Sequence, residues 1–403
     1  MKISNNLPTE NIKLRILKVT DIAWAGGPLD TYAIINSGPL NADSIVLPPS
    51  LYLLNRAKLG AGQNSRRAEA NDLKTFFEAL ARSNRNWLEI TDEQMSNYLK
   101  NHLQAELQLR NPSIKRHIST LKKTYRFAYT NGLTQNPLEY TYHYVEQAEV
   151  KRQGQSNSSE TNLYKKYINK KIFDVISSNI RSADGFLRER DELVLELGYD
   201  CGLRASEVTS KLNLQTKKLR KLINEAEESN NLTITVPIIG KGNKLRHVVF
   251  NAEITQKIRS FLIGRRSKIP DGPLICSKFG NELSSGHASR VFHTALKIAL
   301  PKLRWFTRRA NKSNDDVYTI SFTSITKLSF HALRHTYATN LVSFCYEHGY
   351  DPWHYLMDQL GHAEETTTKI YILFDANIFH RDSIRRKLSK PMKNHNTIEE
   401  IEI

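Results

Sequence analysis

Six residues in the second half of the sequence are of the types that handle a phosphodiester. Arginine and lysine bind the charged oxygens, histidine and lysine exchange protons, and a tyrosine hydroxyl is a nucleophile once a base accepts its proton. Each residue alone is a weak signal, because isolated basic and tyrosine side chains in a basic protein are mostly surface or core residues. The six are Arg204, Lys241, His331, Arg334, His362 and Tyr371.

The local patterns around these residues predict the elements that carry them. Arg204 stands at the start of an expected helix, with Ser206 as a plausible N-cap. Alternating apolar residues over 232–236 and 246–250 predict a hairpin with Lys241 at its tip. Lys244 lies on the same turn and is an alternative to Lys241, although the GKG spacing favours Lys241. His331 and Arg334 are three residues apart, so they share one face of the helix expected over 330–346.

Three further helices are expected before residue 150. The first follows Ser65 and has apolar residues at helical spacing, the second begins with a capping box between Thr91 and Gln94, and the third runs from 111 to Asn131-Gly132. Two short strands are expected in the first 60 residues. One face of the third helix is basic, which suits either a solvated surface or DNA binding. Its basic residues are Lys115, Arg116, Lys122, Lys123 and Arg126.

Composition narrows the class of partner. The chain has 403 residues and 58 basic against 41 acidic side chains, a net charge of +17. Residues 1–150 carry 18 basic and 14 acidic residues and residues 151–403 carry 40 and 27, so the two parts contribute +4 and +13. This excess predicts a polyanionic partner. The polar run at 153–162 (QGQSNSSETN) predicts a linker between the parts.

Several classes of protein are not supported by the sequence. No segment approaches the length of apolar residues that spans a membrane, and the first residues lack the apolar core of a signal peptide, so we expect a cytosolic protein. Three isolated cysteines exclude a disulfide scaffold. Phosphate-binding loops for ATP or NAD are absent, and no cofactor is expected. No metal is expected either, because the pairs of histidine with carboxylates near 362–365 and at 380–382 lack a third ligand at fixed spacing.

Taken in order, four runs of sequence resemble the tyrosine recombinase (phage integrase) family. They are GLRASEV, GKGNKLR, HALRHTYATNL and LGHAEETTTKIY, and the resemblance covers roughly residues 62–390. It implies a mainly α fold with a small β-hairpin or sheet, arranged as a two-domain, C-shaped DNA clamp. The implied domains are an N-terminal extension (1–60), a helical core-binding SAM-like domain (61–148), a linker (149–164), the catalytic domain (165–390) and a C-terminal tail (391–403).

The resemblance also implies a role for each site residue. Tyr371 would attack a DNA phosphate and form a 3′-phosphotyrosyl bond, with His331 as general base and Lys241 as the proton donor to the leaving 5′-oxygen. Two arginines, Arg204 and Arg334, would clamp the phosphate oxygens. The supporting groups would be His362, which would hydrogen-bond the phosphate, and Glu207, which would orient the others. Tyr337 is a second candidate hydroxyl, but it lies on the same helix as His331, and we interpret it as a packing residue.

The expected partner is duplex DNA with inverted half-sites. A homodimer would occupy one site and two dimers would form a synaptic homotetramer, in which strands exchange through a Holliday junction without metal or ATP. Accessory DNA-bending proteins are possible partners, and a membrane is not expected. The protein would be encoded by a bacterium, phage or other mobile element and act in the cytoplasm at the nucleoid. Two alternatives remain: a type IB topoisomerase and a non-cleaving DNA-binding regulator on the same fold.

Two segments depart from the family pattern. Residues 301–327 form a longer connection than this family usually carries, with Trp305 and Phe306 flanked by arginines at 304, 308 and 309. We interpret it as a surface insertion, with DNA or a neighbouring subunit as the alternative contact. The tail has isoleucines at 398, 401 and 403 among acidic residues, and it is either a free end or a segment that docks on the next protomer.

Overall fold

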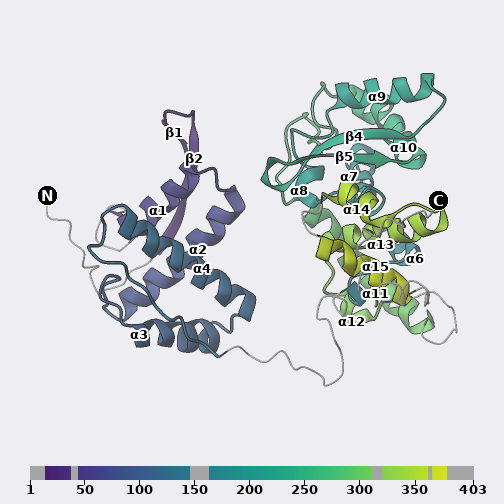
Figure 1. The fold of residues 1–403 in the computed structure, drawn as a ribbon. Helices are drawn as coiled ribbons and strands as arrows, with labels where there is room; N and C mark the ends of the chain where they lie inside the picture. The colour runs from purple at the N-terminus through teal and green to yellow at the C-terminus, as the bar shows by residue number, and fades with distance from the viewer. Residues whose placement is uncertain (1–13, 38–43, 146–162, 311–319, 362–364, 379–403) are drawn as a thin grey trace, which may run out of the picture. The chain divides into compact units, whose positions relative to one another are not determined.

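The computed structural model describes residues 14–37, 44–145, 163–310, 320–361 and 365–378. The chain divides into two compact units, residues 1–154 and 155–403. Each unit is drawn in Figure 1, and each has its own hydrophobic core. The polar run predicted as a linker, 153–162, lies outside the described residues, and the predicted domain boundaries stay predictions. The predicted fold class is confirmed, since the described residues are mainly helical with two small antiparallel sheets.

Unit 1 is a helical bundle with a small sheet packed against it. The two strands expected near the N-terminus are present and pair in antiparallel register, with Ile16 opposite Ile34. Leu14 and Ile34 lie in the same core as Leu73 and Phe76 of the helices, so the sheet and the helices form one body. The elements are β1 (Leu14–Ile22), β2 (Leu29–Asn36), β3 (Ser44–Ile45), α1 (Leu47–Lys58), α2 (Gln63–Arg82), α3 (Asp92–Asn97), the π-helix Tyr98–Glu106 and α4 (Asn111–Thr130).

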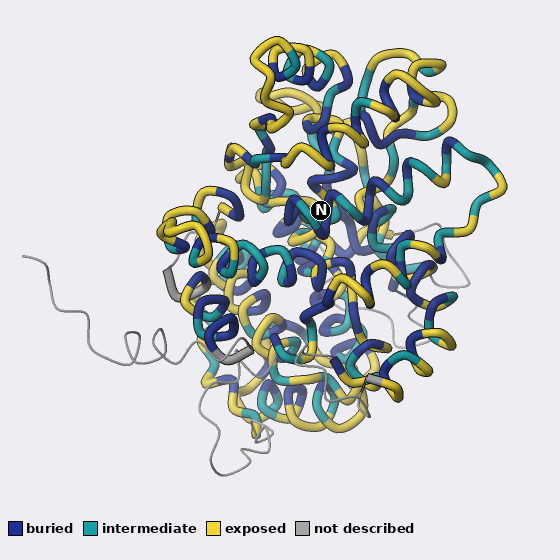
Figure 2. Tube along the Cα trace, turned by 90° about the vertical axis from the view of Figure 1, so that its right-hand side faces the viewer, coloured by how far each residue is buried: buried dark blue, intermediate teal, exposed yellow. Residues whose placement is uncertain are grey.

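Local sequence signals set two helix starts in unit 1. The capping box predicted at Thr91 is present: its side chain accepts a hydrogen bond from Gln94 N, and the Gln94 side chain accepts one from Thr91 N. α4 begins at Asn111, with Pro112 in its first turn where a missing N–H costs nothing. Figure 2 shows the resulting alternation of buried and exposed residues around the turns of the helices.

Unit 2 is built around a long buried helix and a two-stranded hairpin. α7 packs against α10, α11 and α13, and its buried residues include Leu193, Val194 and Leu197. The hairpin pairs Val236 with Val248 and lies between α9 and α14 (Figure 1). Its elements are α6 (Lys170–Ser177), α7 (Gly185–Tyr199), α8 (Ala205–Val208), α9 (Thr216–Glu228), β4 (Ile234–Ile239), β5 (Leu245–Phe250), α10 (Ala252–Ile263), α11 (His287–Ala310), α12 (Phe322–Ile325), α13 (His331–Glu347), α14 (Pro352–Leu360) and α15 (Glu365–Ile378), with 3₁₀ turns at Lys241–Asn243 and Arg265–Lys268.

One local prediction in unit 2 is wrong. Arg204, not Ser206, occupies the N-cap position of α8, because the Glu207 side chain reaches back to accept the backbone N–H of Arg204. α11 runs through Pro301 to Ala310, and this continuation is held by the buried side chain of Leu303. The beginning of the predicted insertion is therefore helical, with Trp305 62% exposed on its surface.

None of the helices in the described residues is long and apolar enough to cross a membrane.

Candidate active site

The carboxylate of Glu207 lies at the centre of the candidate site, with its side chain only 2% exposed. It accepts hydrogen bonds from Arg204, at 2.8 Å from the backbone N and 2.6 Å from Nη1. Arg246 donates two more, from Nη1 at 2.8 Å and from Nη2 at 2.7 Å. Nη1 of Arg334 lies 3.9 Å from Glu207 Oε2. Three guanidinium groups thus lie around one buried carboxylate.

This arrangement leaves the cluster with a net positive charge. Burial alone would raise the pKa of Glu207, but the hydrogen bonds and charge of Arg246, together with Arg204, lower it to about 2. The carboxylate is therefore ionised at neutral pH and offsets one of three positive charges. An excess of about two charges is suited to a phosphate, whose oxygens guanidinium groups bind in pairs. The side chain of Arg204 is 30% exposed and so remains accessible to a ligand.

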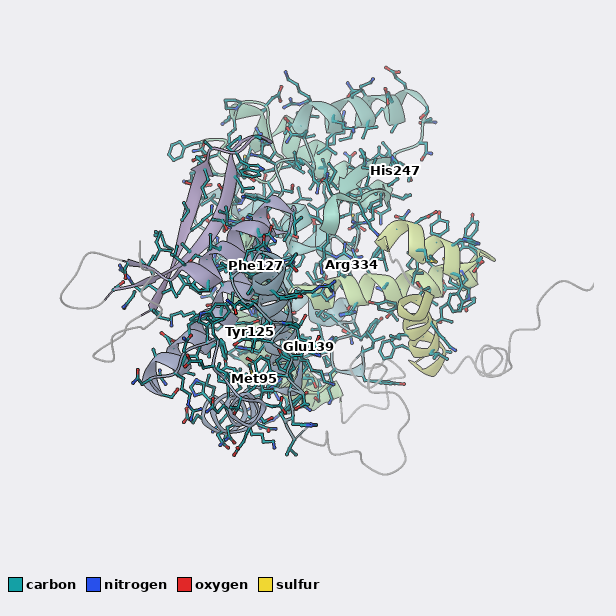
Figure 3. The ribbon with its side chains drawn as sticks, turned by 60° about the vertical axis from the view of Figure 1, so that its left-hand side comes forward. Met95, Tyr125, Phe127, Glu139, His247 and Arg334 are labelled. Atoms are coloured by element: carbon teal, nitrogen blue, oxygen red, sulfur yellow. The ribbon has the colours of Figure 1, made fainter. Side chains whose placement is uncertain are left out.

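Arg334 is held by two backbone carbonyls, one in the loop before α8 and one at the end of α14. Its Nη1 donates to Gly202 O at 2.7 Å and its Nη2 donates to Leu360 O, and the side chain is 2% exposed (Arg334 is labelled in Figure 3). Gly202 has a φ of +64°, and a Cβ there would lie 2.3 Å from the ring of Tyr337, so only glycine fits. Burial, followed by the charge of Arg204, lowers the pKa of Arg334 to about 9, which leaves the guanidinium charged at neutral pH.

Asn213 fixes the hairpin relative to α8. Its Nδ2 donates to the carbonyls of Glu207 and Ile239, each at 3.1 Å, and its Oδ1 accepts the N–H of Ile239 at 2.8 Å. The side chain is buried, so these bonds are protected from water. The end of β4 therefore has a fixed position next to the carboxylate.

The hairpin tip begins at Gly240, which packs against the charged cluster. A Cβ on Gly240 would lie 2.9 Å from Arg246 Nη1 and 3.0 Å from Glu207 Oε1. Lys241, the next residue, is exposed, as is Lys244, whose carbonyl accepts the N–H of Gly240 at 2.8 Å. The close packing of Gly240 brings the backbone of Lys241 to the edge of the cluster.

The candidate nucleophile lies beside two histidines of α13. The Tyr371 hydroxyl is 2.8 Å from Nδ1 of His335, within hydrogen-bond distance. The rings of His331 and His335 meet edge to face, with centroids 4.5 Å apart. Burial raises the pKa of Tyr371 to about 12, although the charges of Arg334 and Arg204 oppose this increase. At neutral pH the phenol is therefore protonated, and it needs a base in order to attack.

His331 is surface-exposed at the start of α13 but has positive neighbours. Partial loss of hydration, followed by the charges of Arg334 and Arg204, lowers the pKa of His331 below its ordinary value. All of these causes favour the neutral ring at physiological pH, and a neutral ring can accept a proton.

The helix that carries Tyr371 is fixed by packing on Tyr164 and by a hydrogen bond to α13. Phe374, one turn later on α15, packs edge to face on Tyr164, with ring centroids 4.7 Å apart. The hydroxyl of Ser343 on α13 donates to the carboxylate of Asp375. Tyr371 itself is 5% exposed and belongs to the same apolar cluster as Leu360. The tyrosine thus meets its histidine within one chain.

The structure brings together five of the predicted site residues and adds two others. Arg204, Glu207, His331, Arg334 and Tyr371 belong to the connected contacts above, and Lys241 follows a glycine that touches them. His362 lies outside the described residues. Arg246 and His335 were not predicted from the sequence. Arg246 had one available signal, because it alternates with the buried Val248 and Phe250 along β5 and so faces inward. Among the described residues, no group of three potential metal ligands is found.

The predicted DNA-binding residues of α4 are all exposed, and carboxylates of α2 hold two of them. Nη2 of Arg116 lies 2.7 Å from Oδ1 of the buried Asp72, and Nζ of Lys123 lies 3.6 Å from Glu69. These pairs restrain the two basic side chains without burying them. The exposed basic residues of α4 are Lys115, Arg116, Lys122, Lys123 and Arg126.

Two family models match the chain. The model of the phage integrase family matches residues 169–377, which is more than half of the chain and includes every residue of the cluster. The model of the phage integrase N-terminal SAM-like domain matches residues 56–132 in unit 1.

Curated relatives and solved structures agree with these matches. The chain is 24% identical over 335 residues to tyrosine recombinase XerC of Thermodesulfovibrio yellowstonii, covering 80% of this chain and 90% of the relative. It is 27% identical over 339 residues to tyrosine recombinase XerD of Rickettsia bellii, covering 83% and 96%. Its fold is similar to that of the XerH site-specific recombinase in a post-cleavage complex with difH DNA, with a TM-score of 0.52, 19% identity and 83% of each chain covered.

Proposed function

This chain belongs to the phage integrase family and is a site-specific tyrosine recombinase, and from that premise we propose how its own residues cleave and rejoin DNA. The observation that carries the proposal is the continuity of one set of contacts. Three guanidiniums surround Glu207, and the charge of one of them, Arg334, acts on the Tyr371 hydroxyl. A nucleophile and a phosphate-binding cluster therefore adjoin each other in a single chain.

The arginine cluster binds the scissile phosphate. Arg204 and Arg334 contact the non-bridging oxygens, whose negative charge increases in the pentavalent transition state. Arg246 and Glu207 fix the orientation of these guanidiniums and touch no substrate. Pre-oriented charges of this kind stabilise a transition state because they do not have to reorganise when the charge develops.

The chemical step exchanges one phosphate ester for another. The Tyr371 oxygen attacks phosphorus, the bond from phosphorus to the 5′-oxygen breaks, and a 3′-phosphotyrosine remains. The tyrosine proton passes to the histidines of α13, among which His331 is the general base that the family resemblance implies, and Lys241 protonates the 5′-oxygen. His362, in the family's motif, hydrogen-bonds the phosphate. Because the new ester conserves the bond energy, rejoining requires no ATP.

We propose that both units bind duplex DNA, as the C-shaped clamp of the family resemblance implies. The basic face of α4 and the arginine cluster would each contact the DNA backbone. Phosphate contacts of this type fix position, whereas base contacts select the site. The exposed Lys122, Arg126 and Lys244 would make such phosphate contacts.

Strand exchange requires more than one protomer. We propose a dimer on inverted half-sites and a synaptic tetramer that passes through a Holliday junction, in the cytoplasm at the nucleoid and with accessory bending proteins where a site demands them. The C-terminal tail, which lies outside the described residues, would dock on the next protomer. The contact between Tyr371 and His335 within one chain favours cleavage in cis, with each protomer cutting the strand that its own arginines bind.

A nicked suicide substrate tests the assignment of the nucleophile. The nick lies close to the cleavage site, so the short 5′-hydroxyl fragment diffuses away and the covalent adduct persists on a denaturing gel. Tyr371→Phe should form no adduct while its DNA affinity is retained. Tyr337→Phe is the matched control, because it removes a hydroxyl from α13, and it should form the adduct. An adduct formed by Tyr371→Phe would disprove the assignment.

The same DNA can distinguish the alternative activities. Two fragments that carry the site should yield recombinant joints. Relaxation without joints would favour a type IB topoisomerase, and binding without any adduct would favour a non-cleaving regulator. The comparisons favour neither alternative.

A further inference from the structure

His335 is the histidine whose ring nitrogen meets the nucleophile. Its Nδ1 lies 2.8 Å from the Tyr371 hydroxyl, which is inside the range required of a general base. His331, the family's candidate base, lies one helical turn earlier, with its ring centroid 4.5 Å from that of His335. Within α13, residues at positions i and i+4 share one face, so both histidines face the same side.

The surroundings of Tyr371 make direct transfer to water unfavourable. The tyrosine is 5% exposed, and its burial keeps the phenol protonated at neutral pH. The ring is restrained in this position because Phe374 of α15 packs on Tyr164 and Asp375 accepts a hydrogen bond from Ser343 of α13. A proton that leaves the hydroxyl therefore needs an acceptor that is already in contact.

We propose that His335 accepts the Tyr371 proton directly during DNA cleavage, while His331 is the next group outward toward solvent. This inference rests on the proposed function, in which Tyr371 is the nucleophile. The Tyr371 O–H bond breaks, its proton joins Nδ1 of His335, and the oxygen forms its bond to phosphorus as the bond to the 5′-oxygen breaks. Lys241 supplies the proton of the 5′-hydroxyl. In rejoining, the imidazolium of His335 returns its proton to the tyrosine oxygen.

The histidine must then exist with an unprotonated Nδ1 before attack. The groups against His335 include Tyr371 of α15 and His331 of α13. The charges that act on Tyr371 are those of Arg334 on α13 and Arg204 at α8. A bound phosphate adds negative charge beside the pair, and this charge favours the imidazolium that forms when the proton is transferred.

The substitution His335→Asn distinguishes proton transfer from positioning. Its side-chain amide can occupy the place of Nδ1 and hydrogen-bond the hydroxyl, but it cannot accept the proton. General base catalysis contributes roughly 10²- to 10⁴-fold, so His335→Asn should slow adduct formation by about that factor while DNA binding is retained. His335→Gln serves as a second variant in case the first does not fold. His348→Asn changes an exposed histidine just after the same helix and should react at the wild-type rate.

A more acidic phenol provides the decisive readout. Difluorotyrosine is placed at position 371 in the wild type and in His335→Asn by nonsense suppression, and single-turnover cleavage is measured. Because a more acidic phenol needs less help from a base, fluorination should restore much of the lost rate in the variant and have little effect in the wild type. A wild-type rate in His335→Asn, or a slow rate that fluorination does not restore, overturns the proposal.

Tyr371→Phe is measured in parallel so that the two failures can be distinguished. No adduct from Tyr371→Phe together with full activity of His335→Asn would leave the proposed nucleophile intact and refute only the role of His335. An adduct from Tyr371→Phe would refute both.

Discussion

Replacing Arg246 by methionine should destabilise unit 2 by removing the main partner of a buried carboxylate. Both Nη atoms of Arg246 bind Glu207, and its Nε donates to Gln359 O at 2.9 Å. The two side chains are 7% and 2% exposed, so water cannot replace the lost bonds. Methionine fills a similar volume without donors. Glu207 would retain Arg204 and the more distant Arg334.

The magnitude follows from the pKa of Glu207, which is lowered from 4.5 to about 2 in the folded protein. A difference of that size corresponds to about 3 kcal/mol of stabilisation of the charged form, of which Arg246 supplies the larger share. Loss of a partner from a buried ion pair costs about 3–5 kcal/mol in other proteins. We therefore expect the free energy of unfolding at pH 7 to fall by about 3 kcal/mol.

The effect should depend on pH with a defined sign. A carboxyl whose folded pKa is lowered stabilises the fold fully above its unfolded pKa, and that contribution disappears as the pH falls through the folded pKa. For Glu207 the window runs from 4.5 down to about 2. The difference in stability between the wild type and Arg246→Met should therefore be greatest at neutral pH and shrink in acid.

Urea unfolding, followed by tryptophan fluorescence, measures this difference. Trp24 and Trp87 are first replaced by phenylalanine, so that the remaining tryptophans, both in unit 2, report the unfolding of unit 2. Arg265→Met is the control, because Arg265 pairs with Glu189 on the surface, where both side chains are at least 40% exposed. Surface pairs contribute about 0–1 kcal/mol, so this variant should change little. A loss below about 1 kcal/mol for Arg246→Met, or a loss that is independent of pH, would refute the reasoning.

Two further predictions concern the reaction and DNA binding. Lys241→Ala should slow cleavage of ordinary DNA but cleave near the wild-type rate when sulfur replaces the 5′-bridging oxygen, because a thiolate leaves without a proton. An equal defect on both substrates would exclude the role of proton donor. Lys244→Ala removes a proposed phosphate contact on the same turn, and any effect of it should be equal on the two substrates. DNA affinity should fall steeply with salt concentration. The single variants Lys122→Ala and Arg126→Ala should each reduce the slope of log K against log salt by about 0.9. Unchanged slopes in equilibrium titrations would show that these residues do not contact phosphates.

Features that depend on neighbouring residues could be predicted from the sequence. The capping box of α3 and the start of α4 involve residues a few positions apart, so their patterns are visible in the chain itself. Alternation of apolar residues was sufficient to predict the hairpin β4–β5, because one of its faces is buried. The resemblance carried by four ordered motifs led to the family.

Local rules failed where distant contacts dominate. Ser206 is a better intrinsic N-cap than arginine, yet the carboxylate of Glu207 caps α8 because Arg246 from β5 holds it in place. Pro301 usually marks a helix boundary, but packing of Leu303 in the core of unit 2 outweighs the lost hydrogen bond, and α11 continues.

The sequence by itself determined which groups this protein has for phosphodiester chemistry, because residue types and motif order are properties of the chain. Only the tertiary structure decided which of these groups touch. Arg246 and Glu207 are 39 residues apart, and His335 and Tyr371 are 36 apart, so no local periodicity relates them. Burial then determines how these groups behave. Water cannot replace the bonds between Arg246 and Glu207, and burial keeps the Tyr371 hydroxyl protonated beside His335.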